Sequence, residues 1–182
     1  MRRALWLAAT LVLFAATLGL TGWPDFKDLA HQREWNVTRA ETAEEALAGV
    51  QVSVREAHAS VIEGGADRAL LHLRVDLQGT PEAAAAWVDC RASLRGADGK
   101  TWLPLTSYFI RGAIKILASD GKDNGNCSVA AVSGTGPATF DEIYRIPASA
   151  LDNLTLHVSG YGTRPAALAF EIEPTVRVFK AE

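Results

Sequence analysis

The chain begins with an uncharged apolar run that limits how everything after it can be placed. No charged residue occurs from Ala4 to Leu20. A helix carried on to Trp23 rises about 1.5 Å per residue and spans about 30 Å of hydrocarbon. The alternative is a cleaved signal peptide, but its apolar region is usually shorter and ends in a small-x-small site, whereas Thr17-Leu18-Gly19 lies inside the run. We therefore predict a transmembrane signal anchor over residues 1–23.

Charged and aromatic residues around this run predict its orientation. Arg2 and Arg3 precede it, and basic residues stay on the cytoplasmic side of a membrane. Trp23 suits the membrane interface, and Pro24 is expected to limit the helix. The sequence thus predicts a single-pass protein of the inner cell membrane with an extracytoplasmic, periplasmic C-terminal domain.

The overall composition narrows the class of protein. Lys and Arg number 18 against 21 Asp and Glu, so the formal charge of −3 disfavours a nucleic-acid partner. Apolar residues make up 48% of the chain and charged residues 21%, which is enough apolar surface for a packed core. We expect a folded domain whose membrane contact is made through the N-terminal helix.

Residues 24–49 are polar and compatible with helix. The stretch from Thr42 to Glu45 has the pattern of a capping box before an alanine-rich turn, and Gly49 would end that turn. We predict a juxtamembrane stalk over residues 24–49.

From Val50 onward, apolar and polar residues alternate with a period of two, which is typical of strands with one wet face. The turn at residues 96–99 joins two of these segments as a hairpin. A short helical turn is expected after Pro147. The predicted strands cover residues 50–54, 71–77, 88–94, 101–103, 140–146, 154–158, 168–172 and 176–178. Alternation this regular, without a long helical stretch, predicts an all-β antiparallel sandwich over residues 50–182.

Two cysteines in an exported domain indicate one disulfide, between Cys90 and Cys127. The alternative is a pair of buried free thiols. A redox-active pair is disfavoured because no Cys-x-x-Cys motif is present.

No metal or cofactor site is predicted. The four histidines show no ligand spacing, and two of them fall on the polar faces of predicted strands, so we expect surface histidines. They are His31, His58, His72 and His157. The segment from Asp120 to Asn126 offers oxygen ligands for calcium but lacks the spacing of a calcium-binding loop, which favours a plain turn.

Several short motifs together resemble uncharacterised bacterial membrane-anchored extracytoplasmic immunoglobulin-like domain proteins, over roughly residues 50–173. They are Cys90 on a strand, the hairpin from Asp98 to Pro104, Cys127, and Ile146-Pro147 leading to the strand from Leu154 to Val158. The resemblance implies an immunoglobulin-like sandwich of unknown role. Gly125 stands where immunoglobulin domains place a tyrosine two residues before the second cysteine, so the bridge need not be the usual inter-sheet one.

The segment from Thr106 to Leu117 lies inside the disulfide loop and fits no clean strand. One interpretation is a core strand or short helix. The other is a partner-binding surface, since aromatic residues with arginine are enriched in binding hot spots. The candidate contact residues are Tyr108, Phe109, Arg111 and Lys115.

No acid, base and nucleophile set stands out, so the protein is not expected to be an enzyme. The leading functional hypothesis is a membrane-anchored extracytoplasmic domain that binds or braces another cell-envelope component, without a cofactor. The alternative is a small-ligand-binding or sensing domain with its ligand at one end of the sandwich.

Overall fold

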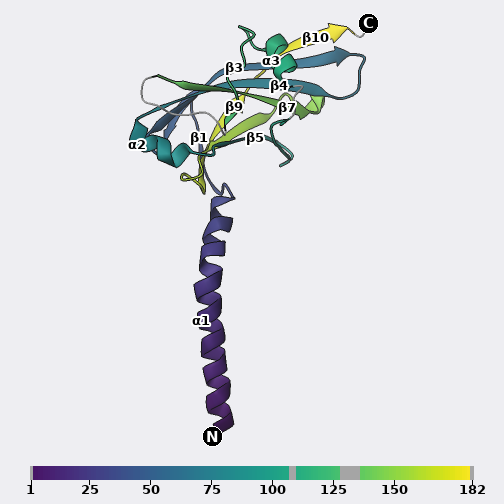
Figure 1. The fold of residues 1–182 in the computed structure, drawn as a ribbon. Helices are drawn as coiled ribbons and strands as arrows, with labels where there is room; N and C mark the ends of the chain where they lie inside the picture. The colour runs from purple at the N-terminus through teal and green to yellow at the C-terminus, as the bar shows by residue number, and fades with distance from the viewer. Residues whose placement is uncertain (1, 107–109, 128–135, 181–182) are drawn as a thin grey trace.

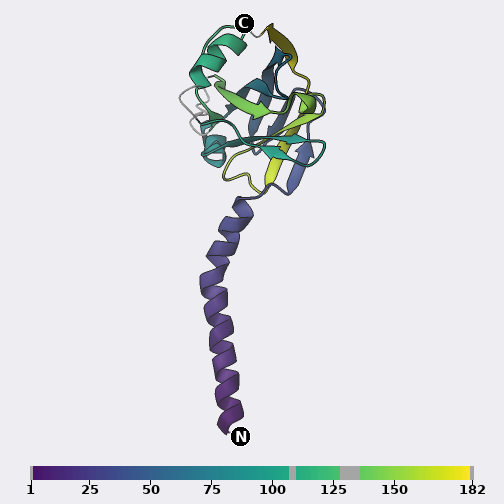
Figure 2. The same ribbon diagram turned by 90° about the vertical axis from the view of Figure 1, so that its right-hand side faces the viewer.

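The computed structural model of the chain describes residues 2–106, 110–127 and 136–180. Over these residues an N-terminal helix, α1 (Arg2–His31), precedes two packed β-sheets. The helix projects from one end of the sandwich with the N-terminus at its far tip (Figures 1 and 2). The predicted architecture, a β-sandwich behind an apolar helix, is confirmed at this level.

Most of the alternating segments of the sequence lie within strands. The strands are β1 (Asn36–Arg39), β2 (Glu44–Leu47), β3 (Val50–Glu63), β4 (Ala69–Gly79), β5 (Arg91–Gly96), β6 (Thr101–Trp102), β7 (Ala138–Ile146), β8 (Leu154–Ser159), β9 (Ala166–Ile172) and β10 (Thr175–Lys180). The expectation of a strand over residues 88–90, and so of Cys90 on a strand, is wrong because β5 begins at Arg91, and β3 continues well beyond residue 54. Among the described residues the first sheet has the order β1-β9-β8-β5-β6, and the second has the order β10-β3-β4-β7 with β2 also pairing β3. The core between the sheets is made by the inward residues of both.

The short helices are α2 (Pro81–Ala84), α3 (Ile110–Leu117), and the 3₁₀ turns η1 (Ala85–Trp87) and η3 (Ala148–Ala150). The turn η3 confirms the helical turn expected after Pro147.

Within the described residues, α1 is the one helix long and apolar enough to cross a membrane, over Trp6–Trp23, and none of that stretch is buried by the rest of the protein. Its threonine hydroxyls donate to the carbonyl four residues earlier at 2.8 to 2.9 Å, which satisfies polar groups that hydrocarbon could not. The expectation that Pro24 limits the helix is wrong, because α1 continues to His31. Proline removes its own backbone donor only, so the turns on either side keep their bonds.

Residues 32–35, after α1, are held on the sandwich. Arg91 Nη1 donates to the Gln32 carbonyl at 2.9 Å, and Ser159 Oγ donates to Glu34 Oε1 at 2.5 Å. The next residue, Asn36, donates its backbone N–H to the Pro165 carbonyl at 3.2 Å. The helix therefore joins the sandwich through a bonded connection.

The segment expected to be a stalk contributes two strands. β1 pairs parallel with β9, and β2 pairs antiparallel with β3. Thr42, expected to begin a helical turn, instead forms a tight turn in which its hydroxyl donates to the Glu44 carbonyl at 2.7 Å. The helical interpretation of this segment is wrong because both strands gain a full ladder of backbone bonds at open sheet edges, which outweighs local helix propensity.

A β-bulge in β3 decides which residues reach the outer face of the second sheet. Val54 pairs with Val75 and Glu56 pairs with Arg74, which leaves Arg55 as the extra residue. The residues that pack into the core therefore change parity: Val50, Val52 and Val54 come before the bulge, and Ala57, Ala59 and Val61 after it. The bulge places Glu56 and His58 on the outer face.

Helix α3 covers part of this outer face, at the end of the sandwich away from α1 (Figures 1 and 2). It buries Ile114 and Leu117 in a small second core with Ile143 of β7 and Leu70 of β4. The segment is thus a short helix that gives its apolar side to a core, one of the two interpretations of the sequence.

Cys90 and Cys127 form the predicted disulfide, with a Cα–Cα distance of 5.4 Å. Cys90 directly precedes β5 of the first sheet, and Cys127 belongs to the segment that leads to β7 of the second. The bridge closes a loop that contains α3 and the turn after it.

Replacing both cysteines by alanine is expected to lower the free energy of unfolding by about 4 kcal/mol, because the unfolded chain regains the entropy of a loop of this length. Urea unfolding of the full-length protein in detergent micelles, followed by the fluorescence of buried Trp87, measures the change. Dithiothreitol should destabilise the native protein by a similar amount and leave the variant unchanged. Equal stability of the two proteins would contradict the prediction.

Candidate functional site

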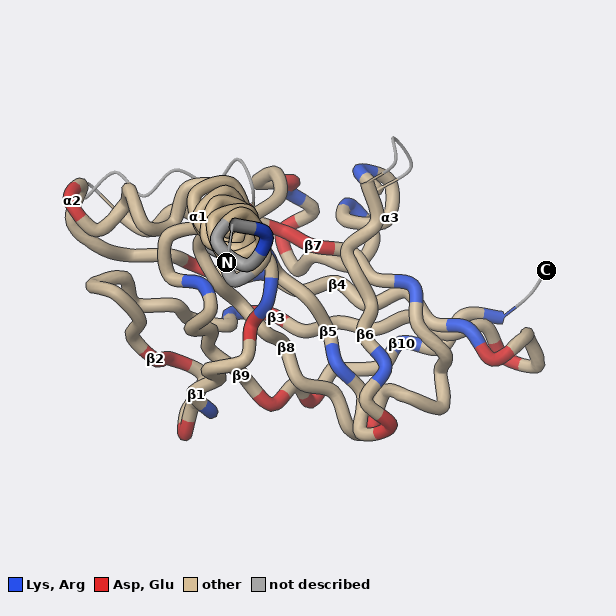
Figure 3. Tube along the Cα trace, turned by 90° about the horizontal axis from the view of Figure 1, so that it is seen from below, with Lys and Arg blue, Asp and Glu red and all other residues tan. Residues whose placement is uncertain are grey.

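Polar side chains gather on the outer face of the second sheet because alternate residues of neighbouring strands lie in register there. His58 of β3 lies opposite His72 of β4, and Glu56 lies opposite Arg74. Arg74 in turn lies opposite Asp141 of β7. We call these five residues the polar cluster. In the view along α1, acidic and basic positions are otherwise interspersed over the strands (Figure 3).

Arg74 is the centre of the polar cluster, and its side chain is only 8% exposed. Its Nε donates to Asp141 Oδ1 at 2.8 Å, and its Nη1 donates to Glu56 Oε1 at 3.1 Å and to Asp120 Oδ1 at 2.9 Å. Its Nη2 donates to the Lys122 carbonyl at 2.9 Å. Burial works to lower the pKa of Arg74, but these carboxylates raise it overall, so the guanidinium stays charged.

Asp141 is the carboxylate of the polar cluster that accepts the most hydrogen bonds from neighbouring groups. Its side chain is fully buried, and it accepts hydrogen bonds from His72 Nε2 at 2.8 Å, from Arg74, and from both the backbone and side-chain N–H groups of Asn124 at 2.8 Å. Burial alone would raise its pKa, yet these donors lower the pKa to about 2. Asp141 is therefore ionised over the physiological range.

The two histidines of the cluster are stacked, with ring centroids 6.3 Å apart and planes 14° from parallel. His72 is fully buried, and His58 Nδ1 lies 3.5 Å from Glu56 Oε2. Neither histidine's Nδ1 has a hydrogen-bond partner in the described part of the chain. Burial lowers the pKa of His58, which favours a neutral ring.

The expectation of surface histidines is wrong for His72 and for His157, which is 7% exposed. α3 and the turn after it cover His72, while Glu34, from the connection after α1, lies against His157. The signal that pairs His58 with His72 is present in the sequence: both lie equally far from Gly65, so a hairpin folded at Gly64-Gly65 brings them opposite each other.

The turn from Asp120 to Asn126 uses its oxygens internally. Asp120 Oδ1 accepts from Arg74 and from the backbone N–H of Lys122, and Asp123 Oδ1 accepts from the backbone N–H of Gly125 at 3.0 Å. One oxygen of Asp120 and one of Asp123 are therefore engaged by donors of the protein itself.

A second buried acid lies on the core side of β7. Glu142 accepts a hydrogen bond from the backbone N–H of Cys127 at 2.9 Å. Burial raises its pKa to about 7, and burial also raises the pKa of its neighbour Tyr144. The sequence analysis did not single out Glu142, although the alternation of β7 places it on the same face as Phe140, Tyr144 and Ile146 and so carries the signal of a buried acid.

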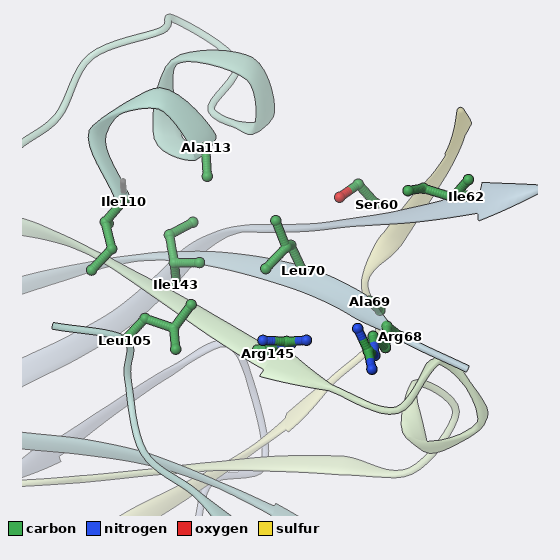
Figure 4. Close-up of a pocket in the computed structure, with 10 residues that line it drawn as sticks. All are labelled: Ser60, Ile62, Arg68, Ala69, Leu70, Leu105, Ile110, Ala113, Ile143 and Arg145. Carbon is green, nitrogen blue, oxygen red and sulfur yellow. The ribbon is translucent and has the colours of Figure 1, made fainter. Parts of the chain in front are cut away.

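An apolar pocket of about 360 Å³ lies beside the polar cluster, between α3 and the outer face of the sheet. Figure 4 shows Ile110 and Ala113 of α3 above Leu70 and Ile143 of the sheet. The lining consists of eight uncharged residues and two arginines. They are Ser60, Ile62, Arg68, Ala69, Leu70, Leu105, Ile110, Ala113, Ile143 and Arg145. A pocket of this size and lining suits a small, mainly apolar ligand.

The predicted partner-contact residues divide into two groups. Tyr108 and Phe109 lie outside the described residues. Arg111 and Lys115 are exposed on α3, and Arg111 Nε lies 3.7 Å from Asp123 Oδ2. Neither lines the pocket.

No protein-family model matches the chain, and a search of curated proteins found no match. Among solved structures, a proposed lipoprotein from Staphylococcus aureus subsp. aureus NCTC 8325 is similar with a TM-score of 0.43 and 10% identity, over 76% of this chain and 95% of that one. An uncharacterised β-sandwich protein from Clostridium difficile 630 gives a TM-score of 0.44 and 7% identity, over 77% of this chain and 96% of that one. Both likenesses are weak, and neither bears on function.

The lowered pKa of Asp141 predicts that the free energy of unfolding decreases at acidic pH. Its folded pKa of about 2 lies below the ordinary value of 3.8, so its contribution is complete above about pH 4 and is lost as pH falls towards 2. We expect about 2 kcal/mol to be lost over this range. Urea unfolding at a series of pH values measures it. Asp141→Asn should remove most of this loss of unfolding free energy at low pH. The control Asp152→Asn, at an exposed site, should keep the loss. An unchanged loss in Asp141→Asn would refute the assignment.

The raised pKa of Glu142 predicts that the free energy of unfolding decreases as the pH rises above about 5. Its folded pKa of about 7 exceeds the ordinary value of 4.5, so the native state holds the proton longer and stability falls as pH rises from about 5 to 8. Glu142→Gln keeps an acceptor for Cys127 and should remove this fall, gaining about 3 kcal/mol at pH 8. Urea unfolding at pH 5 and pH 8 tests it. Exposed Glu82→Gln is the control, and a gain in that variant too would argue against Glu142 as the source.

Proposed function

We propose that the protein is a membrane-anchored, extracytoplasmic binding domain of the cell envelope, without catalytic activity. Residues 1–23 act as a single-pass signal anchor in the inner membrane, with Arg2 and Arg3 on the cytoplasmic side and the sandwich in the periplasm. The apolar, unburied surface of Trp6–Trp23 supports the anchor. The disulfide supports an oxidising compartment for the sandwich.

The observation that carries the binding function is the pocket between α3 and the sheet. Its volume of about 360 Å³ falls in the range of small-molecule sites. It lies at the far end of the sandwich from α1, so a ligand reaches it from the envelope compartment and not from the anchoring bilayer.

The lining specifies the chemistry of the ligand. Arg68 and Arg145 are exposed at the pocket, no acidic residue lines it, and the described residues supply neither guanidinium with an ion pair. The remaining lining is almost entirely aliphatic. The pocket therefore suits a small anion with an apolar body, such as an aryl or alkyl carboxylate, whose charge would meet the arginines.

An envelope protein partner is the second candidate, as the leading hypothesis from the sequence had it. It is favoured by the exposed side of α3, which carries Arg111 and Lys115 one turn apart and Ile116, 60% exposed, directly after Lys115. Aliphatic and arginine side chains together are a common composition of binding surfaces. Contacts through Tyr108 and Phe109 stay a prediction.

An immunoglobulin-like relationship is also part of the proposal. It is supported by two facing, mainly antiparallel sheets joined by a disulfide. The sandwich is not purely antiparallel, because β1 pairs parallel with β9 and β10 pairs parallel with β3.

Binding of a probe tests the pocket. We expect the full-length protein in lipid nanodiscs to bind 4-phenylbutyrate saturably and more tightly than the neutral 4-phenylbutanamide, as measured by isothermal titration calorimetry. Arg68→Gln/Arg145→Gln should weaken phenylbutyrate binding at least tenfold, because the anion loses both charge partners. Arg111→Gln, at an exposed arginine of α3 that does not line the pocket, is the matched control.

The competing outcomes separate the two candidates. Equal affinity for the acid and the amide would reject the anionic ligand. Absence of probe binding, together with capture of one envelope protein by the native protein and its loss on Arg111→Glu/Lys115→Glu, would favour the partner surface on α3.

A further inference from the structure

Two nitrogen lone pairs of the polar cluster lack partners. Nδ1 of His58 and Nδ1 of His72 are buried and accept no hydrogen bond within the described residues. Burying a polar atom without a hydrogen-bond partner is unfavourable, so a pair of them side by side needs an explanation. The proposed pocket ligand does not supply one, because neither histidine lines the pocket.

The other side of each ring is already fixed. His72 Nε2 lies 2.8 Å from Asp141 Oδ1, and an ionised carboxylate can only accept, so Nε2 carries a proton and Nδ1 is the nitrogen that can offer a lone pair to a metal ion. His58 is hydrogen-bonded to the Leu117 backbone. A carboxylate or carbonyl holding the far nitrogen is the outer-shell arrangement that orients metal-binding histidines.

Glu56 brings an oxygen to the same place. Its Oε1 accepts from Arg74 and from the Ser119 hydroxyl, whereas among the described residues Oε2 accepts only from the Ser119 backbone N–H, at 3.0 Å. Oε2 is also the oxygen that lies 3.5 Å from His58 Nδ1. One lone pair of Oε2 is therefore left on the side of the histidines.

We propose that Glu56, His58 and His72 bind a divalent transition-metal ion of the Zn²⁺ class. Their candidate ligand atoms all lie within 4.8 Å of one another, so small side-chain rotations place them around one centre at ordinary metal–ligand distances of about 2.0–2.2 Å. Two imidazoles and one carboxylate are a known zinc ligand set, and a fourth position stays open to water. This inference is independent of the proposed pocket ligand.

The local charge permits a dication. Glu56, Asp120 and Asp141 supply three negative charges, and Arg74, the exposed Arg177 and Lys122 beside Asp120 supply three positive ones, so no net positive charge opposes the ion. The ion would also fasten α3, because Leu117 and Ser119 at its C-terminal end are bonded to His58 and Glu56.

The test is a Zn²⁺ titration of the full-length, tag-free protein in nanodiscs, in competition with a chromophoric chelator. We expect one Zn²⁺ per chain. His58→Ala, at the more exposed ligand, should weaken binding at least tenfold, and Glu56→Gln should do so while keeping an acceptor for Ser119. The matched control is His157→Ala, which removes another buried histidine whose Nδ1 also lacks a hydrogen-bond partner; it should bind Zn²⁺ as the native protein does.

A second readout covers variants that fail to fold. Long-range ¹H–¹⁵N spectra of the native protein should show Nδ1 of His58 and His72 unprotonated, and one equivalent of Zn²⁺ should shift both resonances. The proposal is overturned if the native protein binds no Zn²⁺ saturably, if these two resonances do not shift, or if His157→Ala weakens binding as much as His58→Ala does.

Discussion

The buried ion pair between Arg74 and Asp141 is the interaction on which the outer face of the second sheet depends. An isolated charge in this position would be too costly to bury, and the pair is tolerated because nearly every polar atom of it is hydrogen-bonded. The pair also links three separate parts of the chain: β4, β7 and the turn after α3. Without it, α3 would be held on the sheet by its apolar contacts and by the hydrogen bonds of Leu117 and Ser119 to His58 and Glu56.

The extra residue Arg55 explains why this charged face exists at all. Strict alternation from Val50 would direct Glu56 and His58 into the core between the sheets, where neither could be solvated. The bulge reverses the parity of the strand halfway along its length. One strand can then contribute apolar residues to the sandwich core at both ends and still build a polar cluster on the opposite face.

Much of the sandwich was predictable from the sequence, because period-two alternation reports directly on which side of a strand is buried. The disulfide followed from cysteine number and compartment. The strands β1 and β2 were not predictable in this way, since their residues are largely exposed and gain their structure from pairing with distant edges. The polar cluster was missed for a related reason: its residues alternate with apolar ones and look solvent-facing, and their partners lie far away in the sequence, such as Asn124 for Asp141 and Ser119 for Glu56.

The bonded connection at residues 32–35 has a mechanical consequence. In the proposed anchored state, α1 rises about 12 Å beyond Trp23 before it reaches the sandwich. Because Gln32 and Glu34 are hydrogen-bonded to Arg91 and Ser159, we expect these contacts to restrict how far the domain tilts about the end of α1. The end of the sandwich away from α1 would then stay at a nearly constant height above the lipid. It would meet neighbouring membrane proteins by diffusion in the plane of the membrane, and only those that project to the same height.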